Sequence, residues 1–162
     1  MQTLANIREL LDLAGHAPKK ALGQNFLIDH NLITKLVDAS NISEGDTVLE
    51  IGPGTGALTV AMLDRGASVI AVELDAGLAR VLREQFAGRR FTLIEGDCLA
   101  GKTAINPEAI AAIADAPFSL VANLPYHAAT PAMMTLRPRS TAVLPYSHSR
   151  SGVRWADTMR VS

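Results

Sequence analysis

The sequence predicts an α/β protein built on a mostly parallel sheet. From residue 47 onward, short apolar segments typical of strands alternate with segments whose apolar residues recur at helical spacing. A glycine-rich loop at residues 52–56 joins the first of these strands to the helix that follows it. Strands that alternate with helices pair in parallel through right-handed crossovers. In such sheets ligands bind beyond the carboxyl ends of the strands, so we expect the functional residues there.

Two helices are predicted before the sheet begins. Leucine and isoleucine recur at helical spacing between residues 4 and 11, and Gly15 provides a stop for this first helix. Asp29 can cap a second helix, whose apolar stripe runs from Leu32 to Val37.

The pattern from residue 47 predicts four strands and three helices. In chain order they are strand 47–51, helix 57–65, strand 68–72, helix 76–86, strand 91–95, helix 107–114 and strand 118–122. Residues 137–162 break this pattern, because they are rich in Ser, Arg and Pro without sustained periodicity. We therefore expect a partial α/β domain at residues 1–136, comprising the N-terminal helices and the βα units, and a divergent, disordered tail at residues 137–162.

Composition points to a cytoplasmic protein. With 162 residues, 48% of them hydrophobic and 19% charged, the chain suits one soluble globular domain. It has no apolar stretch near the roughly 20 residues of a membrane span, and no signal-peptide core at its start. A single cysteine, Cys98, excludes an internal disulfide and a multi-cysteine zinc site. We expect neither a metal nor a membrane partner.

Residues 137–162 carry five arginines and one aspartate, which gives them a net charge of +4 and leaves −5 for residues 1–136. The arginines could contact RNA phosphates. A solvated, disordered tail is the explanation that we favour.

The loop Gly52-Pro53-Gly54-Thr55-Gly56 is a candidate ligand-binding loop. Glycines allow the backbone to approach a ligand closely, and the amides of the helix behind them favour electron-rich groups. With the alanine that follows, the string also satisfies the dinucleotide pattern G-x-G-x-x-G/A. The loop alone therefore leaves a nicotinamide-dependent dehydrogenase open.

Three carboxylates narrow the choice of ligand. Glu73 ends the second strand, where an acid can accept hydrogen bonds from both ribose hydroxyls. Asp97 follows the third strand and can accept from an adenine amino group, or else cap a turn. Glu50, inside the first strand, is costly to bury unless it is paired or lies near a cation. Together the acids favour a positively charged nucleoside, such as S-adenosylmethionine, over a diphosphate.

Asn123-Leu124-Pro125-Tyr126 comes directly after the strand at 118–122. The proline biases the leucine toward extended angles, which turns its carbonyl outward. That carbonyl and the asparagine side-chain oxygen can accept from the amino group of a nucleobase, and so help to free its lone pair. The tyrosine could stack on a splayed-out base. A turn with a buried tyrosine is the alternative.

Four motifs occur in an order that resembles the ribosomal RNA adenine dimethyltransferase family, and within it the small-subunit (16S) group linked to kasugamycin sensitivity. They are Gln24-Asn25-Phe26-Leu27, the segment from Glu50 to Gly56, Glu73 with Gly96-Asp97, and Asn123 to Tyr126. The likeness covers about residues 18–136 and does not extend into the rest of the chain.

The resemblance implies a Rossmann-like S-adenosylmethionine-dependent methyltransferase fold, here truncated after the fourth strand. It implies dimethylation of the exocyclic amino group of two adjacent adenines near the 3′ end of small-subunit ribosomal RNA, within an immature ribosomal subunit. The cofactor residues expected from the likeness and the chemistry together are Asn25, Leu27, Glu50, Gly52, Gly54, Gly56, Glu73, Asp97 and Asn123. The expected catalytic residues are Asn123, Leu124, Pro125 and Tyr126.

Three other functions stay open. A large-subunit ribosomal RNA adenine methyltransferase of the macrolide-resistance type shares the motif around Asn25. A dehydrogenase accounts for the glycines and Glu73, but leaves Asp97 and the motif at 123–126 unexplained. The divergent tail also allows an inactive, truncated form that only binds cofactor or RNA.

Overall fold

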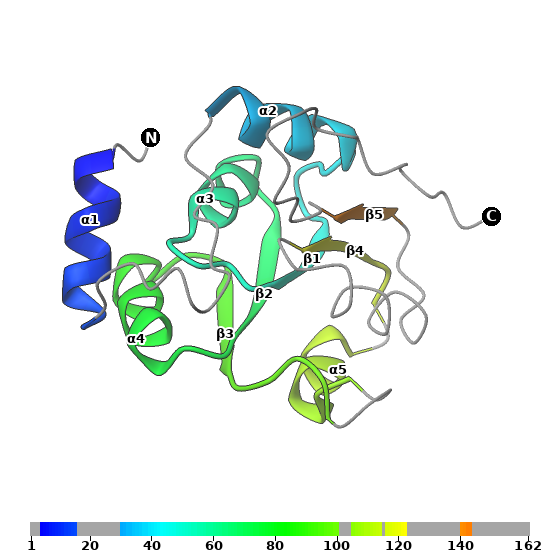
Figure 1. Ribbon diagram of the computed structural model, residues 1–162. Coiled ribbons are helices and arrows are strands. Elements are labelled where there is room, and N and C mark those ends of the chain that lie inside the picture. The colour runs from blue at the N-terminus through cyan, green and yellow to red at the C-terminus, as the bar shows by residue number, and fades with distance from the viewer. Residues whose placement is uncertain (1–3, 16–29, 101–104, 115, 123–139, 144–162) are drawn as a thin grey trace, which may run out of the picture.

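The chain folds around a five-stranded parallel sheet with helices on both faces (Figure 1). The computed structural model describes residues 4–15, 30–100, 105–114, 116–122 and 140–143. The strands are β1 (Thr47–Ile51), β2 (Ser68–Glu73), β3 (Phe91–Glu95), β4 (Phe118–Ala122) and β5 (Ser140–Val143), in the spatial order β3-β2-β1-β4-β5. The helices are α1 (Leu4–Leu13), α2 (His30–Ala39), α3 (Ala57–Asp64), α4 (Ala76–Gln85) and α5 (Pro107–Ile113).

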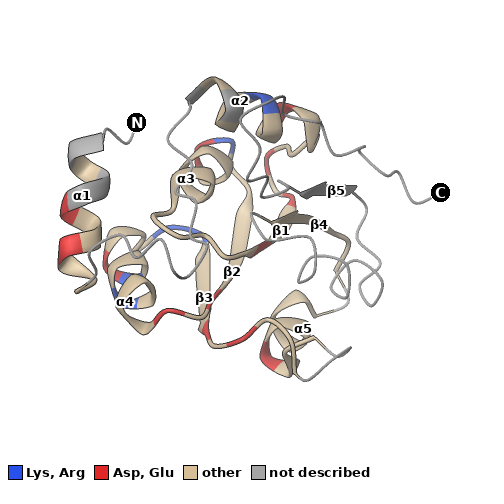
Figure 2. Cartoon of the chain, viewed as in Figure 1, with Lys and Arg blue, Asp and Glu red and all other residues tan. Residues whose placement is uncertain are grey.

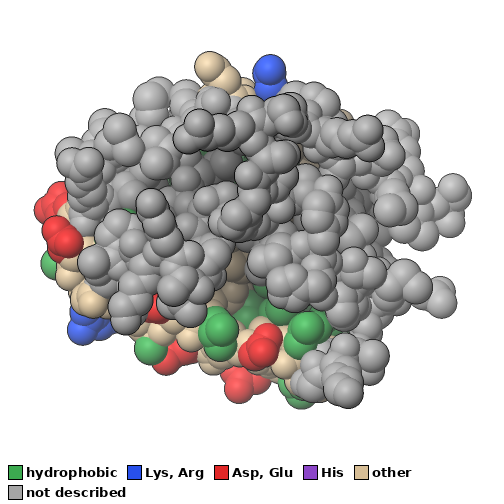
Figure 3. All heavy atoms as spheres, in the orientation of Figure 1, with side chains coloured by type: hydrophobic (Ala, Val, Ile, Leu, Met, Phe, Trp, Pro, Cys, Tyr) green, Lys and Arg blue, Asp and Glu red, His purple; other side chains and the backbone are tan. Residues whose placement is uncertain are grey.

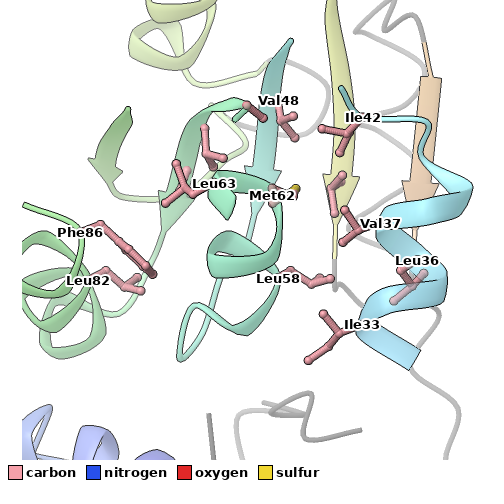
Figure 4. Close-up of a cluster of buried hydrophobic side chains, with 14 residues drawn as sticks. Ile33, Leu36, Val37, Ile42, Val48, Leu58, Met62, Leu63, Leu82 and Phe86 are labelled. Carbon is pink, nitrogen blue, oxygen red and sulfur yellow. The ribbon is translucent and has the colours of Figure 1, made fainter. Parts of the chain in front are cut away.

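Each face of the sheet has its own hydrophobic core, because alternate residues of a strand point to opposite faces. On one face Val48 and Val69 pack with α2, α3 and α4, and Figure 4 shows Met62 of α3 at the centre of this cluster. On the other face Leu49 and Ile70 pack against α5. Strands buried on both faces explain the nearly continuous apolar runs in the sequence.

Helix α1 packs on α4 through a small cluster of its own. Leu11 and Ala14 are buried there against Leu78. Gly77 allows the close approach, because a Cβ at this position would lie 2.2 Å from the carbonyl oxygen of Ala14. Arg80 donates a hydrogen bond of 2.6 Å to the carbonyl oxygen at position 13, and so satisfies one of the free carbonyls at the end of α1.

The predicted α/β fold class is confirmed, and the predicted strands and helices from residue 47 to residue 122 agree with the observed ones to within one residue at each end. The sheet differs from the prediction in not ending at the fourth strand. Residues 140–143, inside the segment expected to be a disordered tail, pair in parallel with β4. The physical reason is that an unpaired β4 edge would leave a row of free backbone groups beside a buried strand.

No helix in the part of the chain covered by the structure is both long and apolar enough to cross a lipid bilayer.

Candidate functional site

The carboxyl ends of the central strands meet at one edge of the sheet. Strand β1 lies between β2 and β4, so the chain leaves β1 toward one side and later returns on the other. Ile51 at the end of β1 is level with Val72 of β2 and Ala122 of β4. Such a point, where the strand order reverses, is where open α/β sheets bind ligands.

The glycine loop after β1 has a backbone that other residues rarely adopt. Gly52, Gly54 and Gly56 have φ angles of 69°, 59° and 79°, which are unstrained for glycine alone. Gly52 donates a hydrogen bond of 3.0 Å to the carbonyl oxygen of Val72. At Gly56 a Cβ would also lie 2.8 Å from the ring of Phe86. The loop therefore requires glycine both for its backbone angles and for packing.

Glu73 fixes this loop to the start of α4. Its Oε2 accepts from the amide of Gly54 at 3.1 Å, and its Oε1 accepts from the amide of Asp75 at 2.9 Å. The residue is only 5% exposed, and burial raises the pKa of its carboxyl, which the two amide bonds partly offset. Glu73 is therefore a buried organising acid and not an exposed strand-end acid. Each oxygen keeps a second lone pair for a ligand hydroxyl.

Glu50 is a buried acid with a hydroxyl partner. Thr59 of α3 donates a hydrogen bond of 2.6 Å from Oγ1 to Oε2 of Glu50, and the two residues are 0% and 1% exposed. Burial raises the pKa of Glu50 to about 7; the hydrogen bond from Thr59 lowers it and the charge of Glu73 raises it. In the described ranges no Lys or Arg forms an ion pair with Glu50. A buried acid without a cation at a ligand edge suits a cationic ligand.

Asp97 caps the turn after β3. Its Oδ1 accepts from the amide of Leu99 at 2.9 Å, which is the turn role considered from the sequence. Asn106 donates to the carbonyl oxygen of Asp97 at 3.0 Å and caps α5 by accepting from the amide of Glu108. Oδ2 of Asp97 makes no hydrogen bond to the residues placed by the structure, so the expected adenine contact stays a prediction.

Acidic residues cluster along this edge, as Figure 2 shows at the ends of β2 and β3 and in the loops that follow them. In the space-filling view, acidic and hydrophobic side chains lie together at the lower rim, over the loop after β3 and α5 (Figure 3). One residue of the edge was missed from the sequence: Leu74, which is 71% exposed between two acids. An apolar residue directly after a strand-end acid is the signal that could have identified it.

Two further residues of the site were also missed. Thr59 is a polar residue within the apolar run of α3 from Ala57 to Leu63, and that position was the available signal. Asp75 accepts from the amide of Leu78 at 3.0 Å and caps α4. An aspartate just before a helical stripe is the usual sequence sign of such a cap.

The remaining expected site residues lie outside the described part of the chain: Asn25, Leu27, Asn123, Leu124, Pro125 and Tyr126. Within the part that is described, no group of three or more His, Cys, Asp or Glu side chains could hold a metal ion.

Comparison with known proteins places this chain in a family. The model of a family described as "Ribosomal RNA adenine dimethylase" matches residues 15–148. The chain is 45% identical over 136 residues to "Ribosomal RNA small subunit methyltransferase A" of Mycobacterium tuberculosis, covering 80% of this chain and 41% of that protein. It is 38% identical over 156 residues to the protein of the same name from Leifsonia xyli, covering 92% and 50%. The chain therefore spans half or less of the length of these two curated relatives.

Solved structures agree with this assignment. The "23S rRNA methyltransferase ErmE" superposes with a TM-score of 0.60 at 27% identity, covering 74% of this chain and 47% of that one. A dimethyladenosine transferase from Plasmodium falciparum gives a TM-score of 0.57 at 26% identity, covering 74% and 42%. The family match also continues past residue 136, where we expected the likeness to end, and includes β5.

Proposed function

The chain belongs to the ribosomal RNA adenine dimethylase family, and on that premise we propose that it methylates ribosomal RNA with S-adenosyl-L-methionine as the methyl donor. The proposed targets are the exocyclic amino groups of two adjacent adenines near the 3′ end of small-subunit RNA, in an immature ribosomal subunit in the cytoplasm. The small-subunit names of the curated relatives favour this target.

The observation that carries the proposal is the acidic edge around the glycine loop. Glu50 is buried there without a described cation, and Glu73 holds the loop through Gly54. These groups fit S-adenosylmethionine, whose bound form supplies an electrophilic methyl group on a positively charged sulfur. Glu50 balances positive charge at the methionine end, and the remaining lone pairs of Glu73 accept from the ribose hydroxyls.

The adenine end of the nucleoside is bound by the loop after β3 and by Leu74. The exposed leucine offers an apolar surface to one face of the adenine ring. Oδ2 of Asp97 accepts from the adenine amino group while Oδ1 holds the turn. By the family likeness, Asn25 and Leu27 complete the methionine end of the site.

The acceptor base is assigned to the residues that follow β4. The side-chain oxygen of Asn123 and the carbonyl of Leu124 accept from the target amino group and help to free its lone pair for attack. Pro125 orients that carbonyl, and Tyr126 stacks on the base. In a single displacement with no covalent enzyme intermediate, the target nitrogen would form its bond to the methyl carbon as the carbon–sulfur bond breaks. S-adenosylhomocysteine would leave, and the extra proton of the product amine would pass to water. Orientation and these two acceptors supply most of the rate.

Labelled methyl transfer to undermethylated small subunits tests the proposal, with Asn123→Ala as the matched variant. We expect transfer by the unaltered chain. In the variant we expect loss of transfer with cofactor binding largely retained, because the other expected cofactor residues are unchanged. Equal turnover in both would falsify the role of Asn123. Cofactor binding without transfer by the unaltered chain would identify it as an inert binding fragment.

A second target is tested in parallel, because the ErmE structure, named for 23S RNA, is a neighbour at 27% identity. Undermethylated large subunits serve as the competing substrate, and preferential transfer to them would reverse the assignment. Calorimetric titration with NAD tests the dehydrogenase alternative, and we expect NAD not to bind.

A further inference from the structure

We propose that Thr59 is a positioning residue of the cofactor site, whose buried hydroxyl favours the ionised form of Glu50 and so makes binding of the cationic cofactor depend on this hydrogen bond. The inference deepens the proposed function and rests on it, because it takes the ligand to be S-adenosylmethionine.

The contact between the two side chains has the geometry of a charge-assisted hydrogen bond. Oγ1 of Thr59 lies 2.6 Å from Oε2 of Glu50, and both residues are at most 1% exposed. Hydroxyl donors to a carboxylate lie at about 2.5–2.7 Å. A threonine in a helix commonly donates its one hydroxyl hydrogen to a carbonyl of the preceding turn. Here it donates across to β1 instead, so the hydrogen serves the acid.

Within the described residues, no positively charged group stabilises the anion of Glu50. Register places Ala71 of β2 and Val121 of β4 beside it. The charge that acts on it is that of Glu73, which disfavours the anion.

The neighbouring helices do not change this balance. The titratable side chains that the structure describes on α2 and α3 are exposed on the surface: Lys35, Asp38 and Asp64. Apart from Thr59, then, burial and a like charge both favour the neutral acid, and the pKa of Glu50 is raised to about 7 even with the hydrogen bond from Thr59 lowering it.

Loss of the hydroxyl therefore has a pH-dependent effect. Without it the pKa of Glu50 rises further, so more of the free protein carries a neutral Glu50 at neutral pH. Glu50 must then lose that proton when the cationic cofactor binds, and the free energy of this deprotonation lowers the binding affinity. Affinity falls at neutral pH and recovers in alkali, where Glu50 is ionised in either case.

The test compares Thr59→Val, which keeps the branched shape, with Thr59→Ser, which keeps the hydroxyl. S-adenosylmethionine affinity is measured by calorimetry from about pH 6 to about pH 9, and the titration of Glu50 is followed by carbon NMR in the ligand-free chain. We expect Thr59→Val to bind about tenfold more weakly near pH 7 and close to normally near pH 9. The Glu50 midpoint moves upward in this variant, and Thr59→Ser resembles the unaltered chain.

A loss of affinity that is equal at every pH, or an unchanged Glu50 midpoint in Thr59→Val, would overturn the inference. If Thr59→Val does not fold, Glu50→Gln decides: its amide cannot ionise, so cofactor affinity must lose the part of its pH dependence that Glu50 contributes, while the amino group of the cofactor still titrates at about pH 8. A pH profile of affinity identical to that of the unaltered chain overturns the inference. Failure of the proposed function has a different signature, namely no cofactor binding by the unaltered chain at any pH. That result also overturns the coupling to cofactor.

Discussion

The carboxylate of Glu73, the last residue of β2, accepts a hydrogen bond of 3.1 Å from the backbone amide of Gly54 in the loop after β1. The same side chain accepts from Asp75 at the start of α4. One buried acid thus joins the ligand loop to the adjacent strand and helix. The shape of the loop and the expected ribose contact depend on the same carboxylate.

Replacing Glu73 with glutamine should weaken S-adenosylmethionine binding by about 10- to 100-fold. Glutamine has one acceptor oxygen, so its amino group must face one of the two amides that the carboxylate now binds. The control is Glu95→Gln, at the register partner of Glu73 on β3, where the side chain is exposed and pairs with Arg83. Calorimetry of both variants checks this, and equal affinities would contradict the organising role.

Glu50→Gln should stabilise the ligand-free chain in alkali. Because the pKa of Glu50 is raised from 4.5 to about 7, the folded state binds more protons than the unfolded state between these values. The favourable contribution is full below about pH 4.5 and is lost as pH rises through about 7. We expect a gain of up to about 3 kcal/mol in the free energy of unfolding near pH 8, and little gain near pH 4.

Urea unfolding at the two pH values measures this difference. The exposed Glu84 of α4 provides a matched control through Glu84→Gln, which should change stability by less than about 0.5 kcal/mol. The interpretation of Glu50 as a buried acid without a cationic partner is wrong if Glu50→Gln is no more stable than the unaltered chain in alkali.

Gly56→Ala should destabilise the chain by about 2–4 kcal/mol. The new methyl group meets the ring of Phe86, and the residue must keep a φ of 79°. Gly88→Ala is the matched control, because Gly88 has the same φ and a Cβ added there would have nothing within 4 Å. The difference between the two variants in thermal unfolding isolates the packing contribution, and the absence of a difference would show that the Phe86 ring moves aside freely.

Arg80→Gln should loosen α1 without unfolding the sheet. The arginine bonds the carbonyl of Leu13 at the end of α1, whereas Arg83 on the same helix pairs with exposed Glu95. Hydrogen exchange of residues 4–13 should therefore become faster in Arg80→Gln and stay unchanged in Arg83→Gln. Equal exchange in the two variants would assign the docking of α1 to its apolar contacts alone.

Cys98 should react slowly with thiol reagents. Burial, together with the charge of Asp97, raises the pKa of its thiol to about 11, and only the thiolate is nucleophilic. Near pH 8 we expect modification by a disulfide reagent to be at least about 100-fold slower in the folded chain than in denaturant. A rapid reaction without denaturant would mean that the loop at Asp97 opens readily.

The sequence predicted the elements whose signals are local. The strands from residue 47 to residue 122 were recognisable because each is a short apolar run bounded by glycine, proline or polar residues. Glu50, Glu73 and Asp97 were placed at one edge because parallel strands align their carboxyl ends.

Contacts between distant segments could not be predicted in the same way. Nothing in the local pattern around Thr59 identifies Glu50 as its acceptor, because the pairing depends on how α3 lies on β1. The strand at 140–143 was underestimated for a related reason. Its pairing with β4 joins two segments that residues 123–139 separate in the sequence. Four residues of weak periodicity also carry little strand signal of their own.

The pairing of Ile51 with Ala122 sets a length scale for the proposed reaction. The glycine loop and the motif at 123–126 follow register partners on two adjacent strands, and adjacent strands lie about 4.8 Å apart. One residue along a strand advances about 3.3 Å. A single deletion within β4 would therefore displace the acceptor by most of a strand spacing and turn its side chains to the opposite face. The register of β1 and β4 thus sets the distance between methyl donor and acceptor in the proposed reaction, independently of any catalytic side chain.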